Sequence, residues 1–279
     1  MSKKIIAFQG TIGANSNLAC IKFYPEFVAK ALPNFFDVFK AVENGEAEKG
    51  MIPLENSYAG RVSEIHNLLQ NSDVAIVAEH FFPITHNLAV IDGTRFEEVK
   101  EVLSHPQALM QCQNNLRDLK VNLREFSNTA EAAKFVAQNG DKSKAAICSK
   151  MAAEINGLKI IKENFQDLQN NVTTFITIAK KPIDVDPQLA QVITTLLFTI
   201  PNIAGSLYHA LGSFANNGVN MLKLESYIPG GFSKEAKFFI TVEGHPNQKN
   251  FSAALVELKS FCEVKMLGTY YADKSRSEK

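Results

Sequence analysis

Apolar and polar residues follow two different periods along the first two-thirds of the chain. Residues 61–70 repeat Val62, Ile65 and Leu69 on one helical face, whereas residues 170–180 are dominated by β-branched side chains, as strands are. Strands that alternate with helices predict an α/β domain with largely parallel pairing. The expected strands are residues 4–9, 51–57, 74–82, 85–91, 99–104, 121–126, 144–149 and 170–180, and the expected helices are residues 15–24, 37–50, 61–70, 105–119, 129–140 and 150–158.

The order of elements changes after the segment KKPIDVDPQLAQ, whose two prolines and two aspartates are typical of a linker. A strand, a helix, two strands, a helix and a last strand follow, which is the βαββαβ order of ferredoxin-like domains. The polar tail after residue 271 is expected to fray. The six elements are expected at residues 193–200, 204–218, 220–228, 235–244, 251–261 and 263–271.

Composition narrows the class of protein. The chain has 279 residues, of which 46% are hydrophobic and 21% charged, so two packed domains are expected. Lys plus Arg (29) balances Asp plus Glu (29), which argues against a nucleic-acid-binding surface. The first residues lack the apolar stretch of a signal peptide, and no run has the length of a membrane span. We therefore expect a cytoplasmic protein whose partners are small molecules or other proteins.

Cysteine and histidine patterns predict no metal site. Cys20, Cys112, Cys148 and Cys262 are scattered without a CxxC pair, so four reduced and mostly buried thiols are expected. The histidines form neither an HxxxH nor an HExxH motif. We therefore expect no bound metal.

A first polar cluster, Gln9–Ser16, follows a predicted strand and enters a predicted helix. Its two glycines, Gly10 and Gly13, let backbone amides approach a ligand, and a helix start capped by Asn15 or Ser16 favours an anion. Ligands of open α/β sheets bind at this end of the strands. The spacing matches neither GxGxxG nor a P-loop, so a nucleotide is not indicated, and a tight turn is the structural alternative.

Two further clusters end predicted strands. Pro53–Ser57 brings a carboxylate and an asparagine to a strand end, where they can orient hydroxyl or carboxylate groups, and an Asx turn is the alternative. Ser104 can cap a helix on which Gln107 and Gln111 share one face, and a capped helix without chemistry is the alternative. His105 is a candidate base, although no serine–histidine–acid order accompanies it.

A fourth cluster, NNVTTF, occupies residues 170–175. Strand alternation places Thr173 on the same face as Phe175, and Thr174 on the opposite face with Ile176. Only one of the two threonines is therefore expected to face a ligand. Surface hydroxyls are the structural alternative.

Together these segments resemble prephenate dehydratase over nearly the whole chain. FQGTIGANSNLA is similar to that family's N-terminal glycine segment, and DLQNNVTTF to its signature, an aspartate, three residues and Asn-x-Thr-Arg-Phe. NIAGSLYHAL and KLESYIPGG resemble the two effector segments of an ACT regulatory domain. Further blocks match in order and at the family's spacing: MIPLENSYAGRVSEIHNLL, SHPQALMQC, NTAEAA and AAICSKMAAEINGL.

The resemblance implies a two-lobed α/β catalytic domain, similar to periplasmic binding proteins, followed by a ferredoxin-like ACT domain. The catalytic domain is expected at residues 1–182, with lobe one at about 1–78 plus 160–182 and lobe two at about 79–159. A linker at 183–192, the ACT domain at 193–272 and a tail at 273–279 complete the expected organisation.

The resemblance also implies the dehydration and decarboxylation of prephenate to phenylpyruvate, a step of phenylalanine biosynthesis that needs no cofactor. Thr173 is implied as the acid for the departing hydroxyl, helped by Asn56, Ser104 and Gln111, while Phe175 walls the ring. The implied substrate-binding residues are Gly10, Thr11, Gly13, Ala14, Asn15, Glu55, Ser57, Asn171, Thr174 and Phe175.

The sequence departs from the family signature at Thr174, where the family has arginine. An arginine grips a carboxylate through a bidentate pair and a threonine does not. Two explanations stay open: either Arg61 or the Gly10–Asn15 turn holds the carboxylate, or turnover is poor. We favour the first, because residue 174 faces away from Thr173.

The ACT resemblance implies feedback inhibition by L-phenylalanine and a homodimer or homotetramer. The family's Glu-Ser-Arg-Pro is here Glu225-Ser226-Tyr227-Ile228, with proline one place later at Pro229. The implied effector-binding residues are Asn202, Gly205, Ser206, Leu207, Glu225 and Ser226.

Three other readings of the sequence are open. Arogenate dehydratase, which makes phenylalanine directly, differs only in the substrate side chain. A phenylalanine-binding regulatory protein with weak or no catalysis would explain the lost arginine at Thr174. A periplasmic-type solute-binding protein is disfavoured because the chain starts without a signal peptide.

Overall fold

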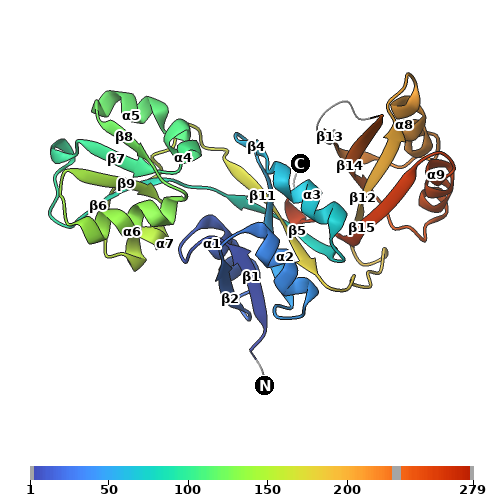
Figure 1. Cartoon of the computed structure of the whole chain (residues 1–279), viewed down its shortest axis with the longest axis horizontal. Helices are drawn as coiled ribbons and strands as arrows, with labels where there is room; N and C mark the ends of the chain where they lie inside the picture. Colours follow the sequence, from blue (N-terminus) through green and yellow to red (C-terminus); the bar gives the residue numbers. More distant parts are fainter. Residues whose placement is uncertain (1–2, 228–233, 277–279) are drawn as a thin grey trace. The chain divides into compact units, whose positions relative to one another are not determined.

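The computed structural model describes residues 3–227 and 234–276, and Figure 1 shows their helices and strands. The chain forms two compact units. The first comprises Met1–Ala41, Glu46–Val62 and Phe81–Phe175, and the second comprises Val42–Gly45, Ser63–His80 and Ile176–Lys279. The candidate ligand residues of the first domain all fall in the first unit, and the candidate effector residues fall in the second.

The first sheet has the strand order β2-β1-β3-β11-β5, with β4 paired to β3. β1 runs parallel to β2 and β3, whereas the short β4 is antiparallel to β3. Its strands are β1 (Ile5–Gln9), β2 (Val28–Leu32), β3 (Lys49–Asn56), β4 (Gly60–Arg61), β5 (Ala75–Pro83) and β11 (Val172–Ala179), and the helices between them are α1 (Asn15–Phe23), α2 (Phe35–Glu43) and α3 (Ser63–Asn71).

The second sheet has the order β10-β6-β9-β7-β8. β7 is parallel to β8 and β9, but β6 is antiparallel to both β9 and β10, so the pairing of the α/β region is mixed rather than largely parallel. Its strands are β6 (Asn87–Val90), β7 (Glu101–Ser104), β8 (Asn122–Glu125), β9 (Lys144–Cys148) and β10 (Lys159–Lys162), and its helices are α4 (Pro106–Gln111), α5 (Gln113–Leu119), α6 (Thr129–Asn139) and α7 (Lys150–Ile155), with the 3₁₀ turn η1 at Phe96–Glu98.

Helices cover both faces of this second sheet. Ala146 and Cys148 of β9 pack with α6 and α7, while the alternating Ala145 and Ile147 pack with α4 and α5. Strand alternation sends neighbouring side chains to opposite faces, so both sides of β9 are buried. This explains the continuous apolar sequence of β9.

The C-terminal strands form a third sheet with the order β13-β14-β12-β15, and each neighbouring pair is antiparallel. The expected βαββαβ order is the observed one. α8 and α9 cover one face of the sheet, where Phe198, Ile240 and Phe214 share a buried apolar cluster. The elements are β12 (Val192–Pro201), α8 (Ser206–Asn216), β13 (Met221–Tyr227), β14 (Glu235–Glu243), α9 (Lys249–Lys259) and β15 (Glu263–Tyr271).

Within the second unit, β15 lies against α3 and β5. The Lys265 Nζ donates to three carbonyl oxygens at the end of α3, those of Leu69 (3.1 Å), Gln70 (2.8 Å) and Ser72 (2.8 Å). Such a cation satisfies carbonyls that a helix end leaves unpaired. At Gly268 the two backbones meet, because a Cβ built there would lie 2.0 Å from the Ile76 carbonyl oxygen.

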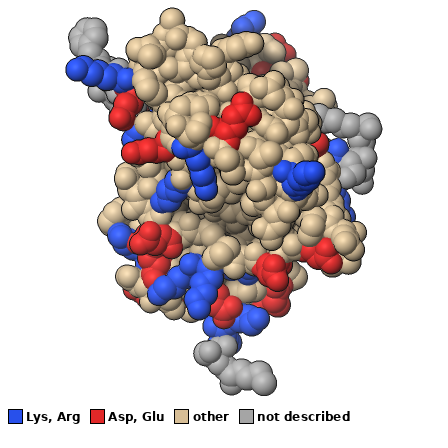
Figure 2. All heavy atoms as spheres, turned by 90° about the vertical axis from the view of Figure 1, so that its right-hand side faces the viewer, with Lys and Arg blue, Asp and Glu red and all other residues tan. Residues whose placement is uncertain are grey.

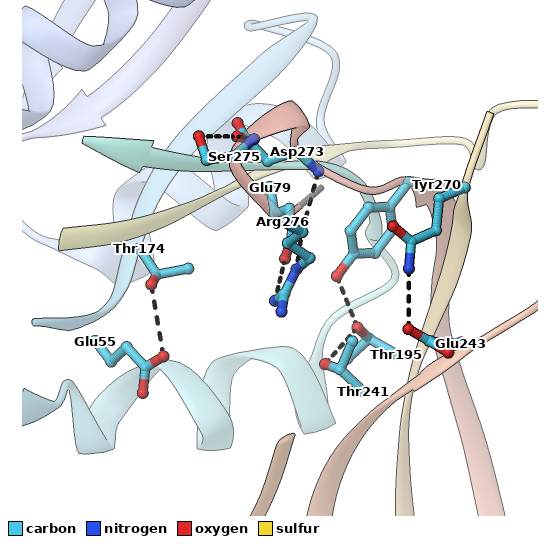
Figure 3. A network of polar contacts seen from close by, with 11 residues as sticks. Glu55, Glu79, Thr174, Thr195, Thr241, Glu243, Tyr270, Asp273, Ser275 and Arg276 are labelled. Atoms are coloured by element: carbon cyan, nitrogen blue, oxygen red, sulfur yellow. Dashed lines mark hydrogen bonds and ion pairs between the residues drawn. The ribbon is translucent and has the colours of Figure 1, made fainter. Parts of the chain in front are cut away.

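The C-terminal segment is bound rather than frayed as far as Arg276, contrary to the sequence-based expectation. The Arg276 guanidinium donates to both carboxylate oxygens of the buried Glu79, from Nε at 2.5 Å and from Nη2 at 2.9 Å, as Figure 3 shows. The backbone N–H of Asp273 donates to the same carboxylate at 3.2 Å. The last turn, η2 (Lys274–Arg276), therefore gives the buried charge of Glu79 its partner.

Several local predictions are wrong, three of them for reasons that local sequence does not show. The expected helix 105–119 is two helices, because Cys112 is non-helical (φ −117°, ψ 17°) and the Asp167 carboxylate accepts from Asn114 N–H at 2.9 Å, capping the second helix from another part of the chain. The N-cap position of α1 is Ala14 and not Asn15 or Ser16, so no side chain caps this helix. β2 and β10 were not predicted, since both are largely exposed and lack apolar alternation.

The surface charges and the cysteines are as the sequence predicts. On the face in Figure 2, Lys and Arg are interspersed with Asp and Glu rather than gathered by sign. Cys20, Cys112 and Cys148 are buried and Cys262 is half-buried, as expected, and all are free thiols. Burial raises the pKa of the Cys20 and Cys148 thiols to about 12. In the described part of the chain, no helix is both long enough and apolar enough to cross a membrane.

Replacing Gly268 by alanine should destabilise the second unit by about 3 kcal/mol, because an added methyl cannot be accommodated against the Ile76 backbone without moving a strand. Urea denaturation measures this loss. The matched control is Gly212→Ala in α8, where the nearest heavy atom is 3.9 Å away, and it should stabilise the protein by about 0.5 kcal/mol through helix propensity. Equal stability of the Gly268→Ala protein and the wild type would contradict the close approach.

Candidate active site

The first unit contains a cavity of about 500 Å³. Its walls come from the start of α1, the β3–β4 turn, the first residues of β11 and the starts of α4 and α6. These are the strand ends at which the sequence placed its polar clusters. The predicted residues that line the cavity are Gly10, Ala14, Asn15, Glu55, Asn56, Gln111, Thr173 and Phe175.

Four helices of the described chain, α1, α2, α4 and α6, have residues of their first turn in the cavity lining. His105 caps α4 by accepting from Gln107 N–H at 3.3 Å, and Asn128 caps α6 by accepting from Glu131 N–H at 2.8 Å. α1 has no side-chain cap at Ala14, so its first amides are not capped in this way. Helix starts carry partial positive charge and unsatisfied N–H groups, so this convergence favours an anion.

Full charges at the cavity are few. Among the described lining residues, Arg61 is the only lysine or arginine and Glu55 the only acid. They are paired neighbours across the β3–β4 ladder. Thr174 does not line the cavity, and its hydroxyl lies 3.5 Å from Glu55 Oε1, as Figure 3 shows. The alternation predicted for this strand is confirmed, because Thr173 and Phe175 line the cavity together.

Three side-chain amides form a closed ring beside Thr173. Asn56 Nδ2 donates to Asn171 Oδ1 (2.6 Å), Asn171 Nδ2 donates to Gln111 Oε1 (2.9 Å), and Gln111 Nε2 donates to Asn56 Oδ1 (3.3 Å). Asn56 Nδ2 also lies 3.0 Å from Thr173 Oγ1. The three residues come from β3, from the residue before β11 and from α4, so the ring ties three segments far apart in sequence.

The orientation of the Asn56 amide is fixed by the backbone. Its Oδ1 accepts from the N–H groups of Tyr58 and Ala59, each at 3.0 Å, in the turn that follows β3. Backbone N–H groups only donate, so the atom that faces them must be the oxygen. The nitrogen of Asn56 therefore faces Thr173, whose oxygen accepts, and the hydroxyl hydrogen of Thr173 remains available to a ligand.

Four predicted residues support the walls instead of lining them. Ser104 is fully buried, and its hydroxyl donates to the Ile147 carbonyl at 2.6 Å. Ser57 ties β3 to β11 by accepting from Val172 N–H at 3.0 Å. Thr11 contacts the Asn128 side chain at 3.3 Å, and the carbonyl of Gly13 accepts from the Ser149 hydroxyl at 2.8 Å.

Gly13 is a glycine for two reasons. Its φ is +89°, which L side chains rarely adopt, and an added Cβ would lie 3.1 Å from the Ala152 Cα. Phe175 is almost fully buried and meets Phe82 edge to face, with ring centroids 6.1 Å apart. The two residues thus shape the cavity through packing.

His86 is the main residue that sequence reasoning missed. It is buried, lines the cavity, and its Nε2 lies 2.7 Å from Gln111 Oε1. Burial lowers its pKa below the usual value, partly offset by the Gln111 contact. The residue falls in the predicted strand 85–91, where a single histidine carries no local pattern that marks a site. Asn128 could have been found, because an asparagine three residues before Glu131 is a helix-start signal.

The candidate effector residues lie in the second unit. Gly205, with φ +86°, caps α8, which begins at Ser206. The Glu225 carboxylate is already engaged, by His66 Nε2 at 2.7 Å and by Lys223 Nζ at 3.2 Å. Burial raises the pKa of Glu225, but these two contacts outweigh it and hold the pKa below its usual value. Ile228 and Pro229 lie outside the described residues.

A comparison with known protein families decides the class of this chain. The family described as prephenate dehydratase matches residues 6–183, which is more than half of the sequence. The chain belongs to the prephenate dehydratase family.

Relatives of this prephenate dehydratase family member carry more than one activity in their names. A bifunctional N-acyl-homoserine lactone acylase/prephenate dehydratase from Komagataeibacter europaeus is 39% identical over 275 residues, which cover 98% of both chains. Arogenate dehydratase/prephenate dehydratase 1, chloroplastic, from Arabidopsis thaliana is 34% identical over 287 residues, covering 98% of this chain and 73% of the relative.

A solved structure shares the fold. Prephenate dehydratase from Arthrobacter aurescens, in complex with L-Phe, has a TM-score of 0.87 at 24% identity and covers 96% of this chain and 89% of its own. This likeness confirms the mixed α/β fold and agrees with the two-lobed core. The prephenate dehydratase match itself ends at residue 183, before β12.

Changing Asn56 to aspartate should lower the free energy of unfolding by about 2 kcal/mol at pH 7, because a donor that faces Asn171 Oδ1 and Thr173 becomes an acceptor. The loss should shrink at pH 4, where a protonated carboxyl can donate again. Urea denaturation at both pH values tests this. Asn170→Asp, an exposed neighbour, is the control and should change stability by less than about 0.5 kcal/mol. A loss independent of pH would contradict the assigned orientation.

Proposed function

We propose that this chain converts prephenate to phenylpyruvate. The observation that carries the proposal is the hydroxyl of Thr173, which faces the cavity, accepts from Asn56 Nδ2 and keeps its hydrogen for a ligand. It lies in the wall of a cavity at which helices begin. Helix starts favour anions, and prephenate carries two carboxylates. Membership of the prephenate dehydratase family supports the same reaction.

The reaction needs few protein groups. Prephenate loses its ring carboxylate as carbon dioxide, and the electron pair of that bond enters the ring. The ring hydroxyl leaves with one proton as water, and aromatisation drives both departures. Thr173 would donate to the leaving oxygen, while the Asn56 N–H donates to Thr173 Oγ1 and so stabilises negative charge that develops there. The proton lost is replaced from solvent.

In this proposal, two features of the cavity compensate for the threonine at position 174, where the family signature has arginine. Arg61 supplies one positive charge to the lining. The start of α1, which no side chain caps, supplies backbone N–H groups for a carboxylate. Gly10, Ala14 and Asn15 at this turn line the cavity, so the first explanation favoured from the sequence is the one that we keep.

Arogenate is a second candidate substrate because of Glu55. Arogenate carries an ammonium group where prephenate has a ketone, and Glu55 is the only acidic residue among the described lining residues. A carboxylate in the wall favours the ammonium form of the side chain. Turnover of both substrates therefore belongs in the first assay. The Komagataeibacter relative is also named for an acylase, so one N-acyl-homoserine lactone should be included.

We further propose that residues 193–272 are an ACT domain that binds L-phenylalanine and mediates feedback inhibition. The βαββαβ order and the antiparallel sheet of this segment support the assignment. The implied site comprises Asn202, Gly205, Ser206 and Leu207 around the start of α8, and the strand residues Glu225 and Ser226. Ile203 and Tyr208 beside it are 71% and 78% exposed, which supports a second copy of the chain as its cover in a homodimer or homotetramer.

Thr173→Val should lower kcat on prephenate by at least about 100-fold, because the hydroxyl donor is lost while the shape is kept. Phenylpyruvate formation by the purified protein measures it. Thr173→Ser should retain activity within about tenfold, since it keeps the hydroxyl. Thr177→Val, on the same strand but outside the cavity lining, is the matched control.

The assay separates the competing functions. A wild-type protein that makes phenylalanine from arogenate much faster than phenylpyruvate from prephenate supports the second candidate. A folded protein that binds L-phenylalanine and turns over neither substrate would be a regulatory protein, and both dehydratase proposals would then be wrong. Thr173→Val with wild-type kcat would remove Thr173 from the chemistry.

L-phenylalanine should inhibit the wild type, and Gly205→Ala should raise the half-inhibiting concentration at least about fivefold. Gly205 adopts φ +86°, so a side chain there strains the turn that presents the α8 start. Inhibition curves at fixed prephenate measure the shift. The control is Gly212→Ala in the middle of the same helix. Equal inhibition of all three proteins would place the effector elsewhere.

A further inference from the structure

His86 ends a chain of hydrogen bonds whose directions can be worked out from one fixed point. The fixed point is Asn56, whose oxygen faces two backbone N–H groups. Its nitrogen therefore faces Asn171 at 2.6 Å, and the facing atom of Asn171 must be the oxygen. Asn171 consequently donates from its nitrogen to Gln111 at 2.9 Å, so the Gln111 atom that accepts must be the oxygen.

The same Gln111 oxygen meets His86 Nε2 at 2.7 Å. An oxygen only accepts, so Nε2 must carry a hydrogen. His86 is therefore the Nε2–H tautomer, and its Nδ1 is left as an acceptor in the neutral form. Protonation would add a hydrogen at Nδ1 and leave the bond to Gln111 in place.

The opposite tautomer would disturb every member of the ring. With Nε2 as an acceptor, Gln111 would turn its nitrogen to His86 and therefore also to the nitrogen of Asn171. Relief would require Asn171 to flip, and then Asn56, whose oxygen is held by the turn after β3. The orientation of the ring is thus fixed at two of its members, at Asn56 by backbone amides and at Gln111 by the imidazole.

We propose that His86 is a positioning residue for the dehydration: as an Nε2–H donor it locks the Gln111–Asn171–Asn56 ring in the one orientation that presents a donor to Thr173. This inference rests on the proposed function for its consequence in catalysis. The tautomer itself does not, because it follows from donors and acceptors in the resting protein. His86 acts on the reacting hydroxyl only through the side-chain amides of the ring.

The tautomer can be read directly in the resting protein. Long-range ¹H–¹⁵N correlation spectra of ¹⁵N-histidine-labelled protein at pH 8, assigned by comparison with His86→Gln, should show hydrogen on Nε2 and a free lone pair on Nδ1. Hydrogen on Nδ1 would overturn the proposal whatever the activity of the protein. An Nε2–H tautomer in a protein that turns over neither prephenate nor arogenate would support the ring orientation and overturn the proposed function.

Two substitutions separate positioning from acid–base chemistry. His86→Met removes the donor at similar volume, and kcat should fall about 10- to 100-fold with KM within about threefold, since Thr173 is no longer held. His86→Gln places an amide nitrogen near Nε2, so kcat should recover to within about threefold of the wild type, with an unchanged pH profile of kcat. Glutamine does not titrate, so recovery excludes His86 as the acid or base.

The control for general damage is His80→Met, because His80 Nε2 contacts a hydroxyl, Thr177 Oγ1 at 3.1 Å, outside the cavity lining. Its kcat should stay within about twofold when corrected for the folded fraction by circular dichroism. The proposal is overturned if His86→Met keeps wild-type kcat, or if His86→Gln is as impaired as His86→Met while folded. The first outcome would make the contact merely structural, and the second would require the imidazole itself.

Discussion

The active site depends on the capture of one side-chain oxygen by two backbone amides. Asn56 Oδ1 sits in the turn after β3, where Tyr58 and Ala59 point their N–H groups at it. A turn of this kind needs only local sequence to form. Its effect is long-range, because a fixed amide at Asn56 dictates which atom every neighbouring polar group presents. Polar networks in a low-dielectric interior are valuable only when every member is satisfied, and this one is closed on itself.

In the second unit, too, a few single residues hold distant segments together. Lys265 satisfies the end of α3, Gly268 lets β15 approach β5, and the Glu225 carboxylate is shared by His66 and Lys223. His66 also meets Phe239 edge to face, at 5.0 Å between ring centroids. The helix α3 and the strand β5, from the first third of the chain, are thereby packed on the face of the C-terminal sheet that α8 and α9 leave open.

Sequence reasoning recovered most elements and the strand ends that meet at the cavity, because hydrophobic periodicity and strand alternation are local properties. It separated Thr173 from Thr174 for the same reason. It could not find His86, since the role of this single histidine shows only in its contact with Gln111. Likewise, Ser104 had the pattern of a helix cap, yet its hydroxyl turns to the Ile147 carbonyl, a partner on another strand. The misses are the residues whose partners lie far away along the chain.

The bidentate grip of Arg276 on Glu79 has a practical consequence for anyone who shortens this protein. The polar residues after β15 look dispensable, but a chain trimmed at the end of that strand would lose Arg276 with them. The Glu79 carboxylate, whose side chain is 3% exposed, would then lose its guanidinium partner. An uncompensated buried charge typically costs about 3–5 kcal/mol. An affinity tag should therefore follow Arg276 and not replace it.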